Sequence, residues 1–190
     1  MLNQTNFEDQ LPSEYKNQAI IAVKDEYTFD FLELAPEHNE RQLERGLITH
    51  VQKFLSEMGG MFAFLGNQYR IIVDGDEFFI DLLLYHRKLR CMVAIELKIG
   101  KFSPADIGQL QFYLTALDEQ EKLPEENSSI GIIICRSKNR TVVEYALKNA
   151  TVPMGVATYR VSDKLPKEMK DLLPGPDEIV KRLRIFEDNE

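Results

Sequence analysis

Two apolar runs joined by a short polar turn constrain the fold of this chain most. The first run, Phe78–Tyr85, has a single acid, Asp81, in its middle, and the second run is Cys91–Leu97. Both runs are short and the second is partly β-branched, so we expect two buried strands. Side chains alternate along a strand, which places Glu96 and Lys98 on the same face of the second one. The turn between the strands then brings Asp81 and Glu96 toward each other.

The charged side chains of these two strands predict a site for a divalent cation. A carboxylate inside a hydrophobic strand is costly unless a cation compensates it. Hard cations such as Mg²⁺ bind oxygen ligands, typically carboxylates, waters and phosphate oxygens. We therefore expect Asp81, Glu96 and the carbonyl of Leu97 to hold the metal. Lys98 is expected to orient a water or to stabilise charge in the transition state.

Plainer roles for the same residues stay open at the level of the sequence. Asp81 could be a hydrogen-bonded or salt-bridged acid within its strand. Glu96 and Lys98 could form an ion pair at a strand end, which contributes little when it is exposed. The combination favours the metal site, because each buried charge needs the others or a cation.

A helical pattern over Asn39–Met58 contributes a third acid. Apolar residues recur there at steps of three and four, and two glycines end the pattern. Glu44 falls within the apolar stripe, whereas solvated acids belong on the far face of a helix. We expect Glu44 to support the metal from this helix. The alternative is a boundary carboxylate that pairs with Arg41 or Arg45.

A second helix is expected to begin after Ser103, which can cap it, and to run to about Lys122. Gln109 and Tyr113 lie four residues apart beside its apolar stripe, and spacing alone favours ordinary polar surface for both. His86, at the turn behind the first acid, is a candidate for substrate contact.

The remaining pattern predicts an α/β fold. Asp74-Gly75-Asp76 is a strong hairpin turn, so we expect a strand on each side of it. The order of helix, antiparallel meander, crossover helix, strand, helix and strand predicts a mixed β-sheet flanked by helices. The other expected elements are strands at Phe62–Leu65, Tyr69–Val73, Ile130–Cys135 and Met154–Tyr159, and helices at residues 139–149 and Pro176–Arg184.

Charge is distributed unevenly along the 190 residues. The net charge is −8, and residues 47–162 balance to zero, because the acidic excess lies in residues 1–46 and 163–190. A face that binds phosphate is therefore compatible with the central region. Residues 1–36 are acidic and weakly periodic, with one short helix expected around Tyr27–Leu34. We interpret 1–36 as a linker or the tail of a missing N-terminal domain.

Composition also bears on the location of the chain. No run approaches the roughly 20 apolar residues of a membrane span, and the acidic first residues lack the pattern of a signal peptide. Cys91 and Cys135 both fall in apolar strand candidates. We therefore expect buried free thiols in a reducing cytoplasm, without a disulfide or a zinc site.

The acids and the lysine match a known motif. Asp81 followed by Glu96-Leu97-Lys98 resembles the D…(D/E)-x-K core of the PDDEXK nuclease superfamily, with Ile80 at the position of the motif's proline. Glu44 and the pair Gln109 and Tyr113 resemble its accessory motifs. The resemblance implies a restriction-endonuclease-like αβββαβ core.

Several blocks resemble, more narrowly, the C-terminal nuclease domain of the YhcG-like bacterial and archaeal proteins. The resemblance covers about residues 28–175, and we place the nuclease domain at 37–186. It implies a DNA endonuclease that uses Mg²⁺, with Mn²⁺ as a substitute, and candidate roles in DNA repair, restriction or mobile-element defence. Its catalytic residues would be Asp81, Glu96, Lys98, Glu44 and Gln109. In that family an N-terminal domain that binds DNA precedes the nuclease domain.

Two alternatives concern activity and substrate. The chain could be a catalytically idle module that binds nucleic acid or protein on the same fold, and this view is motivated by the balanced charge of the central region. RNA could replace DNA as the substrate. A weak homodimer is also compatible with the sequence, since enzymes that cut both strands often present two sites.

Overall fold

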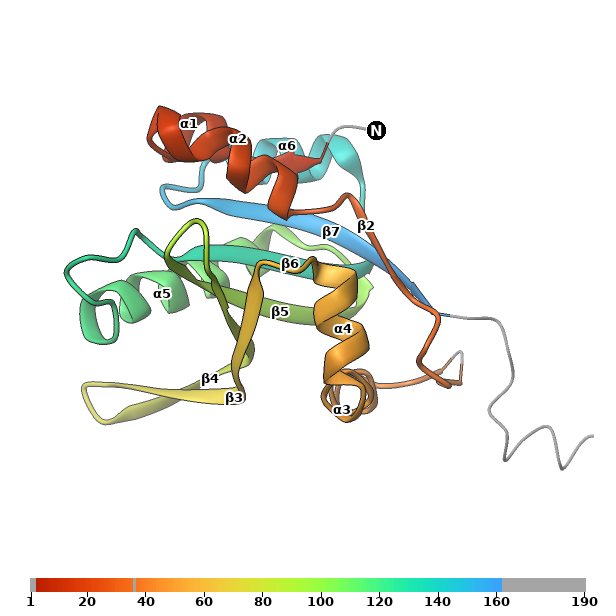
Figure 1. Ribbon diagram of the computed structural model, residues 1–190. Coiled ribbons are helices and arrows are strands. Elements are labelled where there is room, and N and C mark those ends of the chain that lie inside the picture. The colour runs from red at the N-terminus through yellow and green to blue at the C-terminus, as the bar shows by residue number, and fades with distance from the viewer. Residues whose placement is uncertain (1–2, 36, 162–190) are drawn as a thin grey trace, which may run out of the picture.

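The structure is a computed structural model that describes residues 3–35 and 37–161. Its centre is a seven-stranded mixed sheet in the order β1-β7-β6-β5-β4-β3, and β2 also pairs with β7 (Figure 1). The strands are β1 Gln4–Thr5, β2 Glu26–Phe29, β3 Phe62–Val73, β4 Asp76–His86, β5 Cys91–Lys101, β6 Ile130–Ser137 and β7 Met154–Val161. The helices are α1 Phe7–Gln10, α2 Ser13–Ala22, α3 Glu40–Thr49, α4 Val51–Met58, α5 Pro104–Gln120 and α6 Arg140–Lys148.

The expected α/β fold is confirmed. β3, β4 and β5 form an antiparallel meander. β6 and β7 continue the sheet parallel to β5, and α5 and α6 connect them, as parallel strands require crossovers. With α3 and α4 before the meander, this is the αβββαβ arrangement expected from the sequence.

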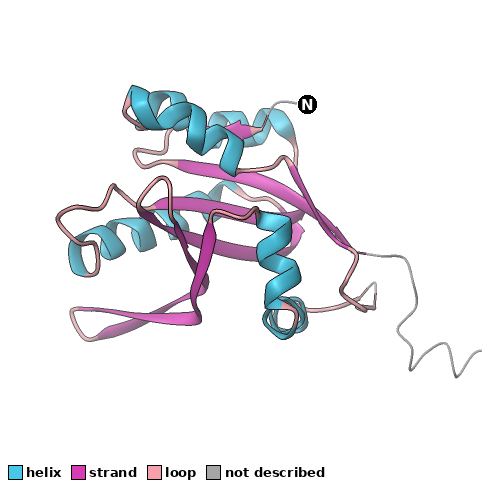
Figure 2. Ribbon diagram, viewed as in Figure 1, coloured by secondary structure: helices cyan, strands magenta, loops and turns pink. Residues whose placement is uncertain are grey.

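Helices cover both faces of the sheet (Figure 2), and the sheet separates the interior into two hydrophobic cores. One core packs α1 to α4 against one face, with Phe29, Leu47 and Ile95 fully buried. The other packs α5 and α6 against the opposite face, around residues such as Leu110 and Ile133. β5 contributes to both cores, which explains its nearly continuous apolar sequence.

The N-terminal segment differs from the sequence interpretation. Residues 3–35 are an integral part of the fold, because β1 and β2 both pair with β7, β1 antiparallel and β2 parallel. Phe7, Tyr27 and Phe29 are fully buried in the first core. The interpretation of this segment as a linker is therefore wrong for the described residues. The helix expected at Tyr27–Leu34 is also wrong, since β2 begins that stretch.

The pattern over Asn39–Met58 forms two helices rather than one. α3 ends at Thr49 and α4 begins at Val51, because His50 adopts a non-helical conformation with φ −113° and ψ 37°. The side chain of Asn39 caps α3 in a capping box with Gln42. The apolar stripe continues across the break, and this is why periodicity alone did not reveal it.

β3 joins the two strands that were expected separately at Phe62–Leu65 and Tyr69–Val73. A register shift between Phe64 and Gly66 marks a β-bulge in it. The predicted hairpin turn is confirmed, with positive φ at Asp74 and Gly75. β4 pairs with β5 only from Leu82 to His86, so the outer part of the β3–β4 hairpin extends beyond the sheet as an arm (Figure 1).

The remaining expectations hold to within a few residues. Ser103 caps α5 and Pro104 occupies its first position, and α5 ends at Gln120 rather than near Lys122. β6, α6 and β7 lie where they were predicted. The helix expected at 176–184 lies outside the described residues. Within 3–35 and 37–161, no helix is long and apolar enough to cross a membrane.

Candidate active site

The site begins where β4 and β5 separate. Their pairing runs from His86 opposite Cys91 to Leu82 opposite Ile95, and then it stops. The next position of this register would be Asp81 opposite Glu96. Here the backbone N–H of Leu97 donates a hydrogen bond to Oδ2 of Asp81 at 2.8 Å. The Asp81 side chain thus takes the place of a ladder partner where β4 and β5 diverge.

Glu96 is the most unusual residue of this site. Its side chain is buried, with 2% relative exposure, and Oε1 receives no hydrogen bond from the residues that the structure describes. Oε2 lies 3.7 Å from Nζ of Lys98. Burial and then the neighbouring Asp81 carboxylate raise the pKa of Glu96 to about 8, against the lowering effect of Lys98. This shift favours the protonated form of Glu96 at neutral pH.

The environment of Asp81 acts on its pKa in both directions. Burial raises the pKa of Asp81 above its ordinary value, and the Glu44 carboxylate adds to the rise. The N–H of Leu97, the Lys98 ammonium and the Gln68 amide oppose the shift without cancelling it. Two acids with raised pKa values next to each other mark a place where negative charge lacks compensation, as is common at functional sites.

Glu44 faces this site from α3. Its two carboxylate oxygens accept hydrogen bonds from Nδ2 of Asn67 at 2.9 Å and from Nε2 of Gln68 at 2.8 Å. The alternative in which Glu44 pairs with Arg41 or Arg45 is wrong, since neither arginine forms an ion pair with it in the described chain. The half-buried side chain instead joins α3 to β3.

Gln68 is the residue of this site that the sequence did not reveal. Its Nε2 also donates to Oδ1 of Asp81 at 3.1 Å, so one amide bridges Glu44 and Asp81. Gln68 has a φ of 45°, which is uncommon for a residue other than glycine. It follows the bulge in β3 and opposes Asp81 across the β3–β4 pair. A polar Gly66-Asn67-Gln68 stretch between two apolar runs was the only signal.

Gln109 and Tyr113 approach the site from α5. Nε2 of Gln109 lies 3.3 Å from Oε2 of Glu96 and 3.0 Å from the hydroxyl of Tyr113. Tyr113 is buried in the second core. The interpretation as ordinary polar surface is therefore wrong for Tyr113. Gln109 is an exposed residue of α5, and its amide nevertheless contacts Glu96.

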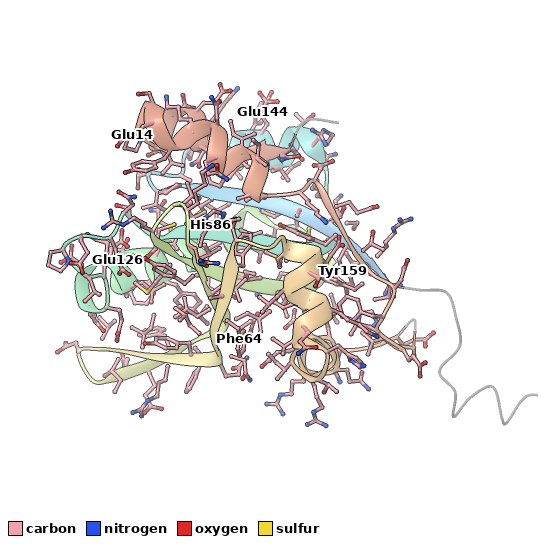
Figure 3. The ribbon with its side chains drawn as sticks, in the orientation of Figure 1. Glu14, Phe64, His86, Glu126, Glu144 and Tyr159 are labelled. Atoms are coloured by element: carbon pink, nitrogen blue, oxygen red, sulfur yellow. The ribbon has the colours of Figure 1, made fainter. Side chains whose placement is uncertain are left out.

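His86 does not belong to the site. It is buried inside the fold (Figure 3), where its Nδ1 accepts a hydrogen bond from the N–H of Leu89 at 3.0 Å. Its ring packs edge-on against Phe62, with 4.8 Å between the centroids. Burial lowers the pKa of His86, so the ring is neutral at neutral pH. The candidate role in substrate contact is wrong, and His86 stabilises the turn after β4.

The donor set fits one hard cation. Within 3–35 and 37–161, no group of three or more His, Cys, Asp or Glu side chains is arranged to hold a metal ion. Asp81 and Glu96 nevertheless supply two neighbouring carboxylates, and the buried Oε1 of Glu96 is an acceptor without a donor. A Mg²⁺ site needs only one or two protein carboxylates. The N–H of Leu97 points to Asp81, and the carbonyl of the same residue projects to the same edge of the strand.

Comparisons with known proteins agree with the motif. The family model described as the YhcG PDDEXK nuclease domain matches residues 20–174. Over 167 residues the chain is 38% identical to the Escherichia coli (strain K12) protein named "Putative nuclease YhcG". The match covers 88% of this chain and 43% of that protein, so the chain spans less than half the length of this relative.

Similar solved structures are more distant. A structure of an EndoMS–dsDNA2 complex has a TM-score of 0.46 at 17% identity, covering 73% of this chain and 49% of the other. A repair endonuclease from Pyrococcus abyssi has a TM-score of 0.43 at 15% identity, covering 67% and 49%. The family match, which extends over most of the chain, decides the assignment. The chain belongs to the YhcG PDDEXK nuclease domain family.

Proposed function

We propose that this domain is a Mg²⁺-dependent DNA endonuclease and that Mn²⁺ can substitute for Mg²⁺. The observation that carries the proposal is the buried Glu96 carboxyl, whose Oε1 has no hydrogen-bond donor among the described residues and which adjoins a second carboxylate and a lysine. Such an arrangement lowers the stability of the fold, and a bound cation and a substrate phosphate would supply the partners that these charged groups lack.

Each residue of the site has a proposed role. Asp81, Glu96 and the Leu97 carbonyl would hold the cation, and Glu44 would support it from α3. A bound Mg²⁺ lowers the pKa of a water and stabilises negative charge on a phosphate. Lys98, partly exposed at 22%, orients the attacking water or stabilises charge on the phosphate. Gln109 fixes the orientation of Glu96 through its hydrogen bond.

The choice of DNA as substrate rests on the resemblance of this motif to DNA-cutting PDDEXK enzymes. Repair, restriction and mobile-element defence are the roles that this resemblance favours. A DNA-binding domain elsewhere in a longer protein is compatible with the length of the relative. A homodimer would present the two sites that cutting of both strands needs. A cytoplasmic location agrees with the two free, buried cysteines.

Cleavage of supercoiled and branched DNA with Mg²⁺ or Mn²⁺ at low salt tests the proposal. Lys98→Ala and Asp81→Asn are expected to lower the cleavage rate by about 10²–10³-fold or more, because each removes charge that acts on the transition state. Lys101→Ala is the matched control, since Lys101 is an exposed lysine on the same strand. Cutting by Lys98→Ala at the wild-type rate would contradict the assignment, and a parallel assay on RNA decides between the two substrates.

The alternative, an idle binding module, makes a different prediction for cation binding. A nuclease should gain thermal stability from Mg²⁺ or Mn²⁺, because a ligand that binds only the folded state stabilises it. Asp81→Asn should abolish that gain. A wild-type chain that binds DNA but neither cuts it nor responds to either cation would favour the idle module.

A further inference from the structure

A pocket of about 440 Å³ lies on the side of α3 next to the acidic site, which is the pair of carboxyls of Asp81 and Glu96. Gln68 lines this pocket and also donates a hydrogen bond of 3.1 Å to Asp81, so it connects the pocket with the acidic site. Glu44, which accepts a hydrogen bond from Gln68, lines the pocket as well. The pocket is lined by Arg41, Glu44, Arg45, Ile48, Thr49, Asn67 and Gln68. A ligand in this pocket would therefore lie next to whatever the acidic site binds.

The charge of the pocket is positive, although the chain as a whole is acidic. Arg41 and Arg45 lie one turn apart on α3, and both side chains are exposed. Neither forms an ion pair with an acid of the described chain. Glu44, the acid between them, directs both of its oxygens to Asn67 and Gln68 instead. Two arginines thus line a pocket whose one carboxylate is already hydrogen-bonded to Asn67 and Gln68.

The donors of this pocket suit a phosphate. A guanidinium group matches the geometry of phosphate oxygens and binds them through two parallel hydrogen bonds. The hydroxyl of Thr49 adds a further donor, and Ile48 offers an apolar surface for a sugar. Contacts of this kind position a nucleic-acid backbone without reading its sequence.

We propose that Arg41 and Arg45 form a subsite for the backbone phosphates of the DNA strand that enters the acidic site. This inference rests on the proposed function, and it names the part of the substrate that α3 contacts. The strand would pass from the α3 pocket over Gln68 to the carboxylate pair. Glu44, tied to Asn67 and Gln68, then serves to keep the arginines and the acidic site in a fixed relation.

The salt dependence of DNA binding tests the subsite. Binding of a labelled duplex is measured by fluorescence anisotropy with Mg²⁺, in chains of all 190 residues that carry Lys98→Ala so that the DNA stays intact. The double variant Arg41→Gln/Arg45→Gln should lower the slope of log affinity against log salt by about two, one for each lost phosphate contact. The factor by which the double variant binds DNA more weakly than the parent chain should then shrink by about tenfold between 50 and 200 mM salt.

Two matched variants separate the effect of position from the effect of charge. Arg87→Gln/Lys88→Gln removes the same charge at the exposed turn between β4 and β5, and should leave the slope unchanged. Arg41→Lys/Arg45→Lys keeps the charge and should restore most of the slope while losing the bidentate geometry. Equal slopes for the parent chain and Arg41→Gln/Arg45→Gln would overturn the inference, as would an equal loss in the Arg87/Lys88 control.

Two further measurements separate this inference from the proposed function and from a simpler ligand. The thermal shift caused by Mn²⁺ should be the same with and without Arg41→Gln/Arg45→Gln, and its loss would mean that the arginines act on the cation site instead. Stabilisation by inorganic phosphate that needs the arginines, with unchanged DNA slopes, would assign the pocket to free phosphate and overturn the inference. A wild-type chain that cuts DNA while the slopes are equal refutes the subsite alone. A wild-type chain that neither cuts nor binds DNA refutes both proposals.

Discussion

At the scale of single residues, Glu96 shows how the site weakens the fold. Its carboxyl is buried next to Asp81, so ionisation in the metal-free protein opposes folding. In the unfolded chain Glu96 ionises near its ordinary pKa of 4.5, whereas in the folded chain the pKa is about 8. The contribution of Glu96 to stability is therefore fully present below about pH 4.5 and is lost as the pH rises through 8.

Glu96→Gln should stabilise the metal-free protein, because the amide resembles the protonated acid and cannot ionise. The gain in melting temperature over wild type should be small at pH 5 and should grow up to pH 8 to 9. Thermal unfolding in the presence of a chelator, measured over this pH range, checks the prediction. A gain that does not depend on pH would mean that ionisation of Glu96 is not the cause.

Glu57 provides a control of opposite sign. Burial alone would raise the pKa of Glu57, but hydrogen bonds from Lys24 and from the N–H of Thr28, with the charge of Lys24, hold it below the ordinary value. Its contribution is therefore present above pH 4.5 and is lost as the pH falls through the lowered pKa. Glu57→Gln should destabilise the protein at pH 7 and less so in acid.

The amide of Gln68 should matter more than its backbone conformation. Gln68→Gly keeps the positive φ at no steric cost but deletes the hydrogen bonds to Glu44 and Asp81. We expect Mn²⁺ affinity, measured by calorimetry, to fall by about 10–100-fold, as is usual when a group that orients a metal ligand is lost. Asp74→Gly, at another position with positive φ, is the control and should bind Mn²⁺ like wild type. Unchanged Mn²⁺ affinity in Gln68→Gly would mean that Gln68 only shapes the backbone of β3.

The residues of the site differ in how far the sequence could predict them. Asp81 and Glu96 interrupt apolar strands, and strand alternation placed Lys98 with Glu96, so their convergence was predictable. The role of Gln68 was not, because it depends on a bulge and on a left-handed residue within β3. Neither feature has a pattern in the sequence beyond one glycine and two amides.

At the scale of secondary-structure elements, helix α5 packs directly against Gly131 of β6. A Cβ atom at Gly131 would lie 2.6 Å from Cδ2 of Leu110 and 2.9 Å from Cδ1 of Leu114. The helix packs this close to the sheet only because the side chain is absent there. Gln109 on the same helix contacts Glu96, so the packing of α5 on β6 also determines the geometry of the site.

Gly131→Ala should therefore destabilise the protein by about 1–3 kcal/mol through overpacking. It should also lower the cleavage rate, because α5 must move away from β6. Gly108→Ala is the matched change on α5 itself, where an added Cβ meets nothing within 4 Å. That change should stabilise the helix by about 0.5–1 kcal/mol. Denaturant unfolding of both variants checks the pair, and equal effects would contradict this account of α5.

Long elements with a clear period were predictable, and short ones were not. α3, α5 and the central strands follow the apolar pattern closely. α1 has four residues and β1 has two, which is too short for a period to register. α2 buries only Ala19 among its own ten residues. β1 is fixed by its pairing with β7, and local sequence carries little sign of such a contact.

At the scale of the whole molecule, residues 3–35 are part of the folded domain. β1 and β2 occupy the outer edge of β7, which would otherwise present unpaired backbone groups. The ring of Phe29 lies among Phe31, Phe54 and Tyr159, so this segment also ties α4 to the sheet.

Phe29→Ala should consequently destabilise the whole domain by about 3–5 kcal/mol, as expected for a large buried aromatic. Ile21→Ala, in the same segment but 76% exposed, should change stability by less than about 0.5 kcal/mol. Urea unfolding followed by circular dichroism measures both. A small effect of Phe29→Ala would return the segment to the status of a dispensable extension.

The two cysteines lie on opposite sides of the sheet. Cys91 belongs to the core under α1 to α4, and Cys135 belongs to the core under α5 and α6. Burial raises the pKa of Cys91 to about 12 and that of Cys135 to about 11, so neither thiol reacts while it stays covered. The native chain thus carries one chemical reporter for each side, and pulse labelling with a thiol reagent reads both at once. Equal labelling rates would show that the two halves open as one unit, and unequal rates would show which half opens first.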